Sequence, residues 1–309
     1  MNYNHALVTG GAGFIGSHIV EKLLDKGIEV TVLDNLSVGK KENIPVDAKF
    51  VEGDIQDINL LKELTNQCDC IFHQAAKVSI RASMNECYED AQTNLMGTLN
   101  ILRACEDAKV KKFVFASSMA VYADSPKVEP IDENYKKGPL SPYGIAKLAS
   151  EQYIHLMCRK NNIKSVVLRY FNTFGPRQTL TPYVGVITIF INKLLNGESP
   201  VIFGEGNQLR DFVYVGDIAS ANILALEKDI TEVTLNIGTG EPTSVNRIAE
   251  ILIQKINPGI KAIRGPEYPE ELKISFADIT KAKQYIGYKP EFDLEDKIKE
   301  IIDYIKNNS

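Results

Sequence analysis

Residues 9–16 of the chain read TGGAGFIG. The apolar residues 6–8 before them are typical of a buried strand, and the apolar spacing over residues 14–26 predicts an amphipathic helix. The glycines therefore fall in a strand-to-helix turn. There a missing Cβ atom lets the backbone approach a pyrophosphate, and the helix N-terminus offers free N–H groups to it.

A carboxylate follows this turn at an informative distance. A second predicted strand, residues 29–33, ends at Asp34, which lies eighteen residues after Gly16, about where dinucleotide-binding folds hold a ribose diol. The combination of strand, turn, helix and acid predicts dinucleotide binding rather than an ordinary glycine turn. Because the carboxylate would repel a 2′-phosphate, it favours NAD over NADP.

Predicted strands and helices alternate through the first half of the chain. Four more runs predict strands, at residues 49–52, 70–73, 112–116 and 166–170. Helices are predicted through residues 95–108 and over 142–160, the latter with Ser141 as its cap and Pro142 in its first turn. This alternation predicts an α/β fold, a doubly wound parallel sheet of the Rossmann type with helices on both faces.

The pattern changes after residue 172. A helix near residues 187–196 follows, with strands at 200–204, 212–215 and 235–237, and the last two could return to the main sheet. We expect residues 1–172, completed by about 212–243, to form the dinucleotide-binding domain. Residues 173–211 and 244–309 are expected to form a smaller, discontinuous C-terminal substrate domain across the carboxyl ends of the strands, where such sheets bind ligands.

Composition excludes several classes of function. The 309 residues carry a net charge of −5 without a basic stripe, so no nucleic-acid partner is expected. No apolar run approaches the roughly 20 residues of a membrane span, and the N-terminal residues do not have the pattern of a signal peptide. We therefore expect a soluble, cytoplasmic protein. The five cysteines and four histidines show no ligand spacing, so no metal site is expected.

The segment YGIAK at residues 143–147 is the strongest catalytic signal. Residues four apart share one face of a helix, and an ammonium beside a phenol is expected to lower a phenol pKa that starts near about 10. Tyr143 could then take a proton from a sugar or alcohol hydroxyl. Tyr and Lys pairs are also common on helix surfaces, but here Ser118 ends the preceding strand and could hydrogen-bond the reacting oxygen.

Motifs in a fixed order extend this pattern over nearly the whole chain: GGAGFIG at 10–16, DNL at 34–36, GDI at 53–55, HQAA at 73–76, Asn94, SS at 117–118, YGIAK at 143–147, RYFN at 169–172, GPRQ at 175–178, RDF at 210–212 and NIGTG at 236–240. With them the chain resembles the extended short-chain dehydrogenases/reductases of the NAD-dependent epimerase/dehydratase family, most closely the UDP-glucose 4-epimerases.

The resemblance implies NAD as cofactor, a UDP-sugar as substrate, and Ser118, Tyr143 and Lys147 as catalytic residues. The residues that it places around the cofactor are Gly10, Gly13, Phe14, Ile15, Gly16, Asp34, Asn35, Leu36, Ser37, Gly39, Asp54, Ile55, Gln74, Ala75, Ala76, Lys77, Asn94, Ser117, Tyr143, Lys147 and Phe171. Those around the substrate are Ser118, Tyr143, Asn172, Val186, Val201, Phe203, Arg210, Tyr268 and Ser275. Asn172 and Arg210 would contact the diphosphate and Phe203 the uracil, although Phe203 also fits a core position on an edge strand.

Three positions bear on the activity. Dehydratases and decarboxylases of the group carry an acid directly after the catalytic Ser or Thr, whereas this chain has Met119, which leaves elimination without its acid. A usual diphosphate-binding Arg position holds Tyr268, so either diphosphate binding is weaker or Arg264 or Lys273 replaces that contact. The small Ser275 occupies the position that borders the sugar's C2 substituent in the resembling epimerases, which predicts that N-acetyl sugars also fit.

These observations predict an NAD-dependent UDP-hexose 4-epimerase that interconverts UDP-glucose and UDP-galactose through a transient 4-keto sugar and acts as a homodimer. Another nucleotide-sugar oxidoreductase or epimerase of the family shares the same residues. An NAD-sensing regulator is a third interpretation, although a sensor would not need the base. The physiological sugar, the oligomer and the pathway stay open.

Overall fold

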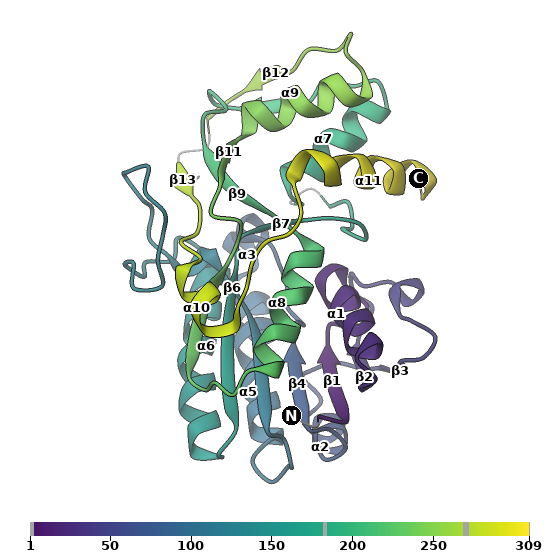
Figure 1. Ribbon diagram of the computed structural model, residues 1–309, viewed down its shortest axis with the longest axis vertical. Helices are drawn as coiled ribbons and strands as arrows, with labels where there is room; N and C mark the ends of the chain where they lie inside the picture. Colours follow the sequence, from purple (N-terminus) through teal and green to yellow (C-terminus); the bar gives the residue numbers. More distant parts are fainter. Residues whose placement is uncertain (1–2, 182–183, 268–271, 309) are drawn as a thin grey trace.

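A seven-stranded parallel sheet forms the lower part of the molecule (Figure 1). The computed structural model describes residues 3–181, 184–267 and 272–308. The strands lie in the order β10-β6-β5-β4-β1-β2-β3. Their bounds are His5–Thr9 (β1), Glu29–Asp34 (β2), Lys49–Glu52 (β3), Cys70–His73 (β4), Lys112–Ser118 (β5), Lys164–Tyr170 (β6) and Val233–Ile237 (β10). The strand order reverses between β1 and β4, and ligands bind at such a reversal in open α/β sheets.

Helices cover both faces of this sheet, which confirms the doubly wound α/β prediction. Successive residues of a strand point to opposite faces, and β1 shows the consequence. Ala6 and Val8 join the core under α1 (Phe14–Asp25) and α8 (Val215–Glu227). Leu7 joins the opposite core under α2 (Ile58–Thr65), α5 (Gly97–Ala104) and α6 (Pro142–Lys160).

A second, smaller assembly lies above the carboxyl ends of the main sheet (Figure 1). Its apolar core is formed by α7 (Val186–Leu195), α9 (Val245–Ile256) and α11 (Leu294–Asn307). Strand β9 (Leu209–Tyr214) pairs with β7 (Asn172–Phe174), β11 (Pro242–Ser244) and β13 (Ile274–Ser275). Strand β8 (Val201–Phe203) pairs separately with β12 (Ile263–Gly265).

Two elements differ from the sequence expectation. Residues 212–215 do not return to the main sheet: they belong largely to β9, whereas residues 235–237 do return as part of β10. Periodicity does not reveal this, because Phe212 and Val213 are both buried, in different cores. The helix expected through residues 95–108 is divided into α4 (Cys87–Ala91), a π-helical turn (Gln92–Met96) and α5, which ends at Ala104.

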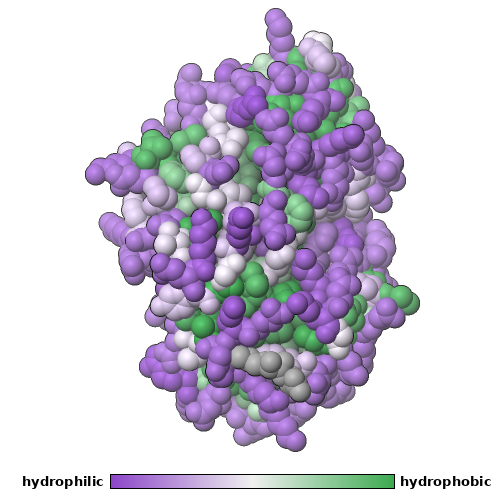
Figure 2. All heavy atoms as spheres, viewed as in Figure 1, coloured by the Kyte–Doolittle hydropathy of each residue, from purple (hydrophilic) through white to green (hydrophobic). Residues whose placement is uncertain are grey.

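One helix near the C-terminus packs against the main sheet rather than against the smaller assembly above it. Ala282 and Ile286 of α10 (Thr280–Ile286) belong to the core under the main sheet, although they follow residue 244 in the chain. Part of the range expected for the substrate domain thus packs with the main-sheet core. The division of the chain into two domains stays a prediction. Figure 2 shows that the face in view is mostly hydrophilic, with an apolar band across its middle, at the level of α8 and α10 in Figure 1.

Candidate active site

The glycine turn between β1 and α1 leaves no room for side chains. A Cβ atom on Gly10, whose φ is +70°, would lie 2.6 Å from the backbone nitrogen of Ala75, and one on Gly16 would lie 2.2 Å from the carbonyl oxygen of Gly10. Gly13 is the N-cap of α1 and provides no side-chain cap, so the first N–H groups of the helix stay available. Phe14 and Ile15 begin that helix. This cradle fits a dinucleotide pyrophosphate.

Asp34 closes the turn at the end of β2. Its Oδ2 accepts a hydrogen bond from the backbone nitrogen of Ala12 (3.0 Å) and its Oδ1 one from Leu36 (2.9 Å). The side chain is 8% exposed, and each carboxylate oxygen can accept a second hydrogen bond, as a ribose diol would require.

Residues 35–39 wrap around this carboxylate. Asn35 donates a hydrogen bond to Asp54 (2.7 Å) and accepts one from the backbone of Ser37 (3.0 Å). A Cβ on Gly39 would lie 2.9 Å from the carbonyl carbon of Ala12, so this segment lies directly over the turn. Ile55 is buried beside Gly97. The structure thus brings the residues predicted for the adenosine end together.

The segment after β4 forms the next part of the site. Asn94, in the π-helical turn, accepts a hydrogen bond from the backbone nitrogen of Lys77 (2.9 Å) and donates one to its carbonyl oxygen (3.0 Å). The backbone at Ala75 and Ala76 is therefore held between the glycine turn and the fixed Lys77. The Gln74 side chain lies instead within hydrogen-bonding distance of the Tyr170 hydroxyl, at 3.3 Å. The predicted cofactor residue Phe171 is buried, and its backbone nitrogen donates to Ile237 of β10.

The predicted catalytic residues meet where α6 packs on the end of β5. Ser141 caps the helix by accepting a hydrogen bond from Gly144, and this orients Tyr143 in the first turn. Lys147, one turn further, is 2% exposed, and its Nζ donates to the carbonyl oxygen of Ala116 at 2.8 Å. The same Nζ lies 5.8 Å from the centre of the Tyr143 ring. Ser118 ends β5, next to this pair.

The pKa of Tyr143 differs from the sequence expectation. Burial raises it to about 12, a hydrogen bond with Ser118 opposes the rise, and the charge of Asp90 adds to it. Burial also lowers the pKa of Lys147 to about 8, against the opposing charges of Asp90 and Glu151. The phenol pKa of these residues alone is therefore raised rather than lowered, because burial of Tyr143 outweighs the hydrogen bond with Ser118.

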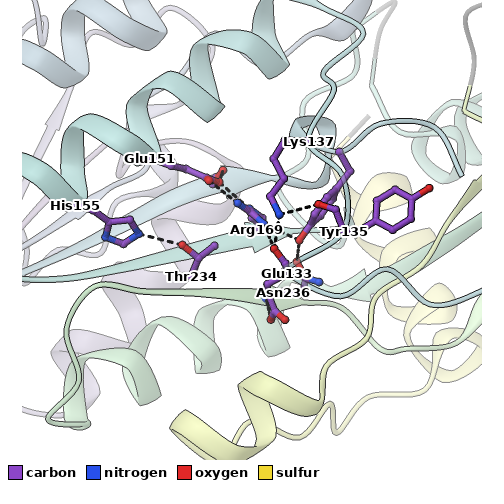
Figure 3. A network of polar contacts seen from close by, with 10 residues as sticks. Glu133, Tyr135, Lys137, Glu151, His155, Arg169, Thr234 and Asn236 are labelled. Atoms are coloured by element: carbon purple, nitrogen blue, oxygen red, sulfur yellow. Dashed lines mark hydrogen bonds and ion pairs between the residues drawn. The ribbon is translucent and has the colours of Figure 1, made fainter.

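The side chain of Ser117, predicted to lie at the cofactor, has a protein partner. It precedes Ser118 in an extended strand, so the two side chains point to opposite faces of the sheet. The Ser117 hydroxyl donates to Glu151 Oε1 at 2.5 Å and is 2% exposed. Glu151 in turn pairs with Arg169, in a network that reaches Glu133, Lys137 and Asn236 (Figure 3). The Ser117 hydroxyl is therefore part of this buried network, and a contact of Ser117 with the cofactor stays a prediction.

The predicted diphosphate residues lie in the upper sheet. Arg210 of β9 is 7% exposed, and its guanidinium donates to the carbonyl oxygens of Leu209 (2.9 Å) and Leu272 (2.5 Å). Ser275 is directly opposite Arg210 in the pairing of β13 with β9. The Ser275 hydroxyl and the Asn172 side-chain oxygen are both buried with no hydrogen-bond partner among the described residues. Unpartnered buried polar atoms of this kind suit a polar ligand.

The remaining substrate predictions lie on α7 and β8. Val186 begins α7, and Val201 and Phe203 begin and end β8, all three half-buried. The guanidinium of Arg81 lies 5.9 Å from the centre of the Phe203 ring. Tyr268 lies outside the described residues. Arg264, one of its two possible substitutes, donates hydrogen bonds to Asn246 Oδ1 and to the carbonyl oxygen of Glu205, both at 3.0 Å.

The sequence pattern does not reveal Asp90, which affects both Tyr143 and Lys147. Its only signal is its spacing of four residues from Asn94. Among the residues with described positions, no group of three or more side chains could hold a metal ion. Within the same ranges, we find no helix with the length and apolar character needed to cross a membrane.

Comparison with known proteins supports this geometry. Residues 6–238 match the model of the NAD dependent epimerase/dehydratase family. The UDP-glucose 4-epimerase of Thermotoga maritima, solved with UDP-glucose, is 40% identical, with a TM-score of 0.95 over 98% of this chain and 99% of its own. The UDP-N-acetylglucosamine 4-epimerase of Methanobrevibacter ruminantium, solved with UDP-N-acetylmuramic acid, is 38% identical, with a TM-score of 0.94 over all of both chains.

A third structure contains the cofactor. The UDP-glucose 4-epimerase of Thermus thermophilus, in complex with NAD, is 35% identical, with a TM-score of 0.92 over 99% of this chain and 100% of its own. The recognised family and the Rossmann fold are thus confirmed together, as is NAD as the cofactor. This chain belongs to the NAD-dependent epimerase/dehydratase family and is an enzyme of its UDP-sugar epimerase group.

Proposed function

We propose that the chain interconverts the C4 epimers UDP-glucose and UDP-galactose through a transient 4-keto sugar. The observation that carries this proposal is the convergence of Ser118, Tyr143 and Lys147, with Met119 directly after Ser118 and 8% exposed. A thioether can neither give nor take a proton, so these residues supply a base for alcohol oxidation but no acid for elimination.

In this proposal the residues divide the work as follows. Bound NAD supplies the acceptor, and afterwards the donor, of the C4 hydride. Tyr143 takes the O4 proton and later returns it, while Ser118 hydrogen-bonds the same oxygen. Lys147, fixed by the carbonyl oxygen of Ala116, stabilises negative charge on the phenol oxygen. Proton and hydride both return to the sugar, so the reaction has no net redox change.

Nucleotide binding is assigned to the remaining predicted residues. We assign the glycine turn, Asp34, residues 35–39 and residues 74–77 to NAD, in a cofactor domain of residues 1–172 and 212–243. Residues 173–211 and 244–309 would hold the UDP-sugar, with Arg210 and Asn172 at the diphosphate. The buried side-chain oxygen of Asn172, which has no hydrogen-bond partner among the residues described and lies on the strand next to that of Arg210, supports this assignment.

The substrate range is proposed to include UDP-N-acetylglucosamine and UDP-N-acetylgalactosamine. The small Ser275 supports this, and one similar structure is named as a UDP-N-acetylglucosamine 4-epimerase. Incubation of the purified protein with the four UDP-sugars, followed by separation and identification of the products, tests the proposal. Formation of C4 epimers without consumption of NAD supports it. A different nucleotide-sugar product, or stoichiometric loss of NAD, would favour the alternative of another oxidoreductase of the family.

A homodimer is proposed from the outer face of α6. Ile145, Tyr153 and Leu156 follow helical spacing along this face and are 57%, 44% and 57% exposed. Tyr88 and Met96 add apolar surface on α4 and the π-helical turn, which pack against α6. Exposed apolar side chains gathered on neighbouring helices suit a protein–protein interface. Light scattering should give a dimer mass that Tyr153→Lys reduces to that of the monomer. A cytoplasmic location without a nucleic-acid partner completes the proposal.

A further inference from the structure

A buried carboxylate lies beside the Tyr143–Lys147 pair. Asp90 is on α4, which packs against α6, and only 1% of the residue is exposed. Its Oδ1 accepts a hydrogen bond from Asn94 Nδ2 at 2.9 Å, whereas Oδ2 is enclosed with no partner in the part of the chain that the structure describes. A buried carboxylate with only one of its oxygens bonded costs folding free energy, so its presence here calls for a physical reason.

Asn94 connects this carboxylate to the proposed site. The Asn94 side chain accepts a hydrogen bond from the backbone nitrogen of Lys77 and donates one to its carbonyl oxygen. The backbone carbonyl oxygen of Asn94 accepts a hydrogen bond from the Ser150 hydroxyl of α6 at 3.2 Å. Asp90 therefore supports both the segment assigned to NAD and the helix that carries Tyr143. The arrangement holds a negative charge in a fixed, water-excluded position, where charges act more strongly than at a surface.

The charge of Asp90 shifts the pKa values of Tyr143 and Lys147 in the same direction. It favours the protonated form of Lys147 and disfavours the phenolate of Tyr143, so it raises both pKa values. Burial raises the pKa of Asp90 itself, whereas the hydrogen bond from Asn94 and the positive charges of Lys147 and Lys77 favour its ionised form.

The other titratable groups around Lys147 are either paired with another residue or neutral. Glu151, on the same helix, is paired with Arg169. His73 of β4 is kept neutral because burial lowers its pKa to about 3. Asp90 is therefore the carboxylate near the pair that has no cationic partner bonded to it among the described residues.

We propose that Asp90 is a positioning residue that sets the protonation state of the Tyr143–Lys147 pair. This inference deepens the proposed function, because it rests on Tyr143 as the base. Loss of the Asp90 charge shifts the whole pH window of the reaction to lower pH, since base and ammonium both lose their proton more readily. A residue that only supports the helix would lower the rate at every pH without moving the window.

Asp90→Asn tests this with almost no change in shape, and Asp90→Ala removes the hydrogen bond as well. Glu89→Gln removes the neighbouring exposed charge of the same helix and is the matched control. For each protein, kcat/KM is measured against pH with UDP-glucose. Tyr143 is also titrated directly, as the difference in tyrosinate absorbance between each protein and its Tyr143→Phe counterpart.

We expect both limbs of the pH profile and the Tyr143 titration to move down by roughly one pH unit in both Asp90 variants, and not in Glu89→Gln. Unmoved limbs and an unmoved titration in variants with native-like unfolding midpoints would overturn the proposal. The absorbance titration needs no turnover. A protein that converts none of the UDP-sugars would thus contradict the proposed function, while the titration would still decide the role of Asp90.

Discussion

Glu151 and Arg169 form a buried, two-pronged ion pair, with the guanidinium donating to Oε1 at 2.9 Å and to Oε2 at 2.6 Å. Their side chains are 1% and 4% exposed. The pair fixes α6 to β6 two turns beyond Tyr143, and Tyr122 accepts a further hydrogen bond from Arg169 at 2.8 Å. The helix face that carries Tyr143 and Lys147 is therefore held by a fully desolvated contact.

Glu151→Gln should lower the free energy of unfolding by about 3–5 kcal/mol, because it leaves the Arg169 charge buried without its partner. The matched control is Glu232→Gln, which breaks the exposed pair of Glu232 with Arg159 and should change stability little. Denaturant unfolding of both variants checks this. Equal effects of the two substitutions would show that the buried network does not stabilise the fold.

Tyr143→Phe should reduce kcat by roughly 10²–10⁴-fold, because it removes the proton acceptor and keeps the ring. NAD content should not change, since the hydroxyl is not needed to fill the glycine cradle. Tyr285→Phe, an exposed tyrosine on α10, is the control and should keep full turnover. Near-normal turnover of Tyr143→Phe, measured with NAD bound, would remove this residue from the mechanism.

The fold and the central residues of the candidate site could be predicted because local sequence motifs encode them. The glycine turn, Asp34 and the Tyr143–Lys147 spacing depend on local backbone geometry, which short motifs encode. The sheet that β9 joins depends on long-range pairing, and both faces of that strand are buried. The resemblance places Ser117 at the cofactor, but it does not show that strand alternation turns the Ser117 hydroxyl toward Glu151.

Electrostatics was the least predictable part of the site. A sequence shows that Lys147 lies beside Tyr143, but not that burial raises the Tyr143 pKa to about 12. It also gives no sign that Asp90, remote from the motif along the chain, packs against the same helix. Such effects depend on how much water the folded chain excludes, which no residue spacing expresses.

Asp34 should make the protein select NAD over NADP. In a binding titration of cofactor-free protein, we expect Asp34→Asn to reduce this preference by roughly ten- to a hundredfold, since it removes a charged acceptor and its repulsion of a 2′-phosphate. Asp25→Asn, at the exposed end of α1, is the control for a loss of charge alone. Equal binding of the two cofactors by the parent protein would contradict the role of Asp34.

Ser275→Tyr should exclude N-acetyl sugars while leaving space for a C2 hydroxyl. We expect kcat/KM for UDP-N-acetylglucosamine to fall by roughly 10–100-fold, and that for UDP-glucose to change much less. Ser275→Ala removes only the unpartnered hydroxyl and should keep both substrates. If the parent rejects the N-acetyl sugar, or if the Tyr variant accepts it equally well, Ser275 does not determine the substrate range.

Epimerisation through a 4-keto sugar can be followed by the hydrogen at C4. UDP-glucose carrying deuterium at C4 is incubated with the purified enzyme, and the UDP-galactose formed is analysed by mass spectrometry and NMR. The mechanism with Tyr143 as base and a returning hydride predicts that the deuterium stays at C4 of the product in inverted configuration, with no net reduction of NAD. Exchange of the deuterium with solvent, accumulation of NADH with turnover, or the absence of any UDP-galactose would contradict it.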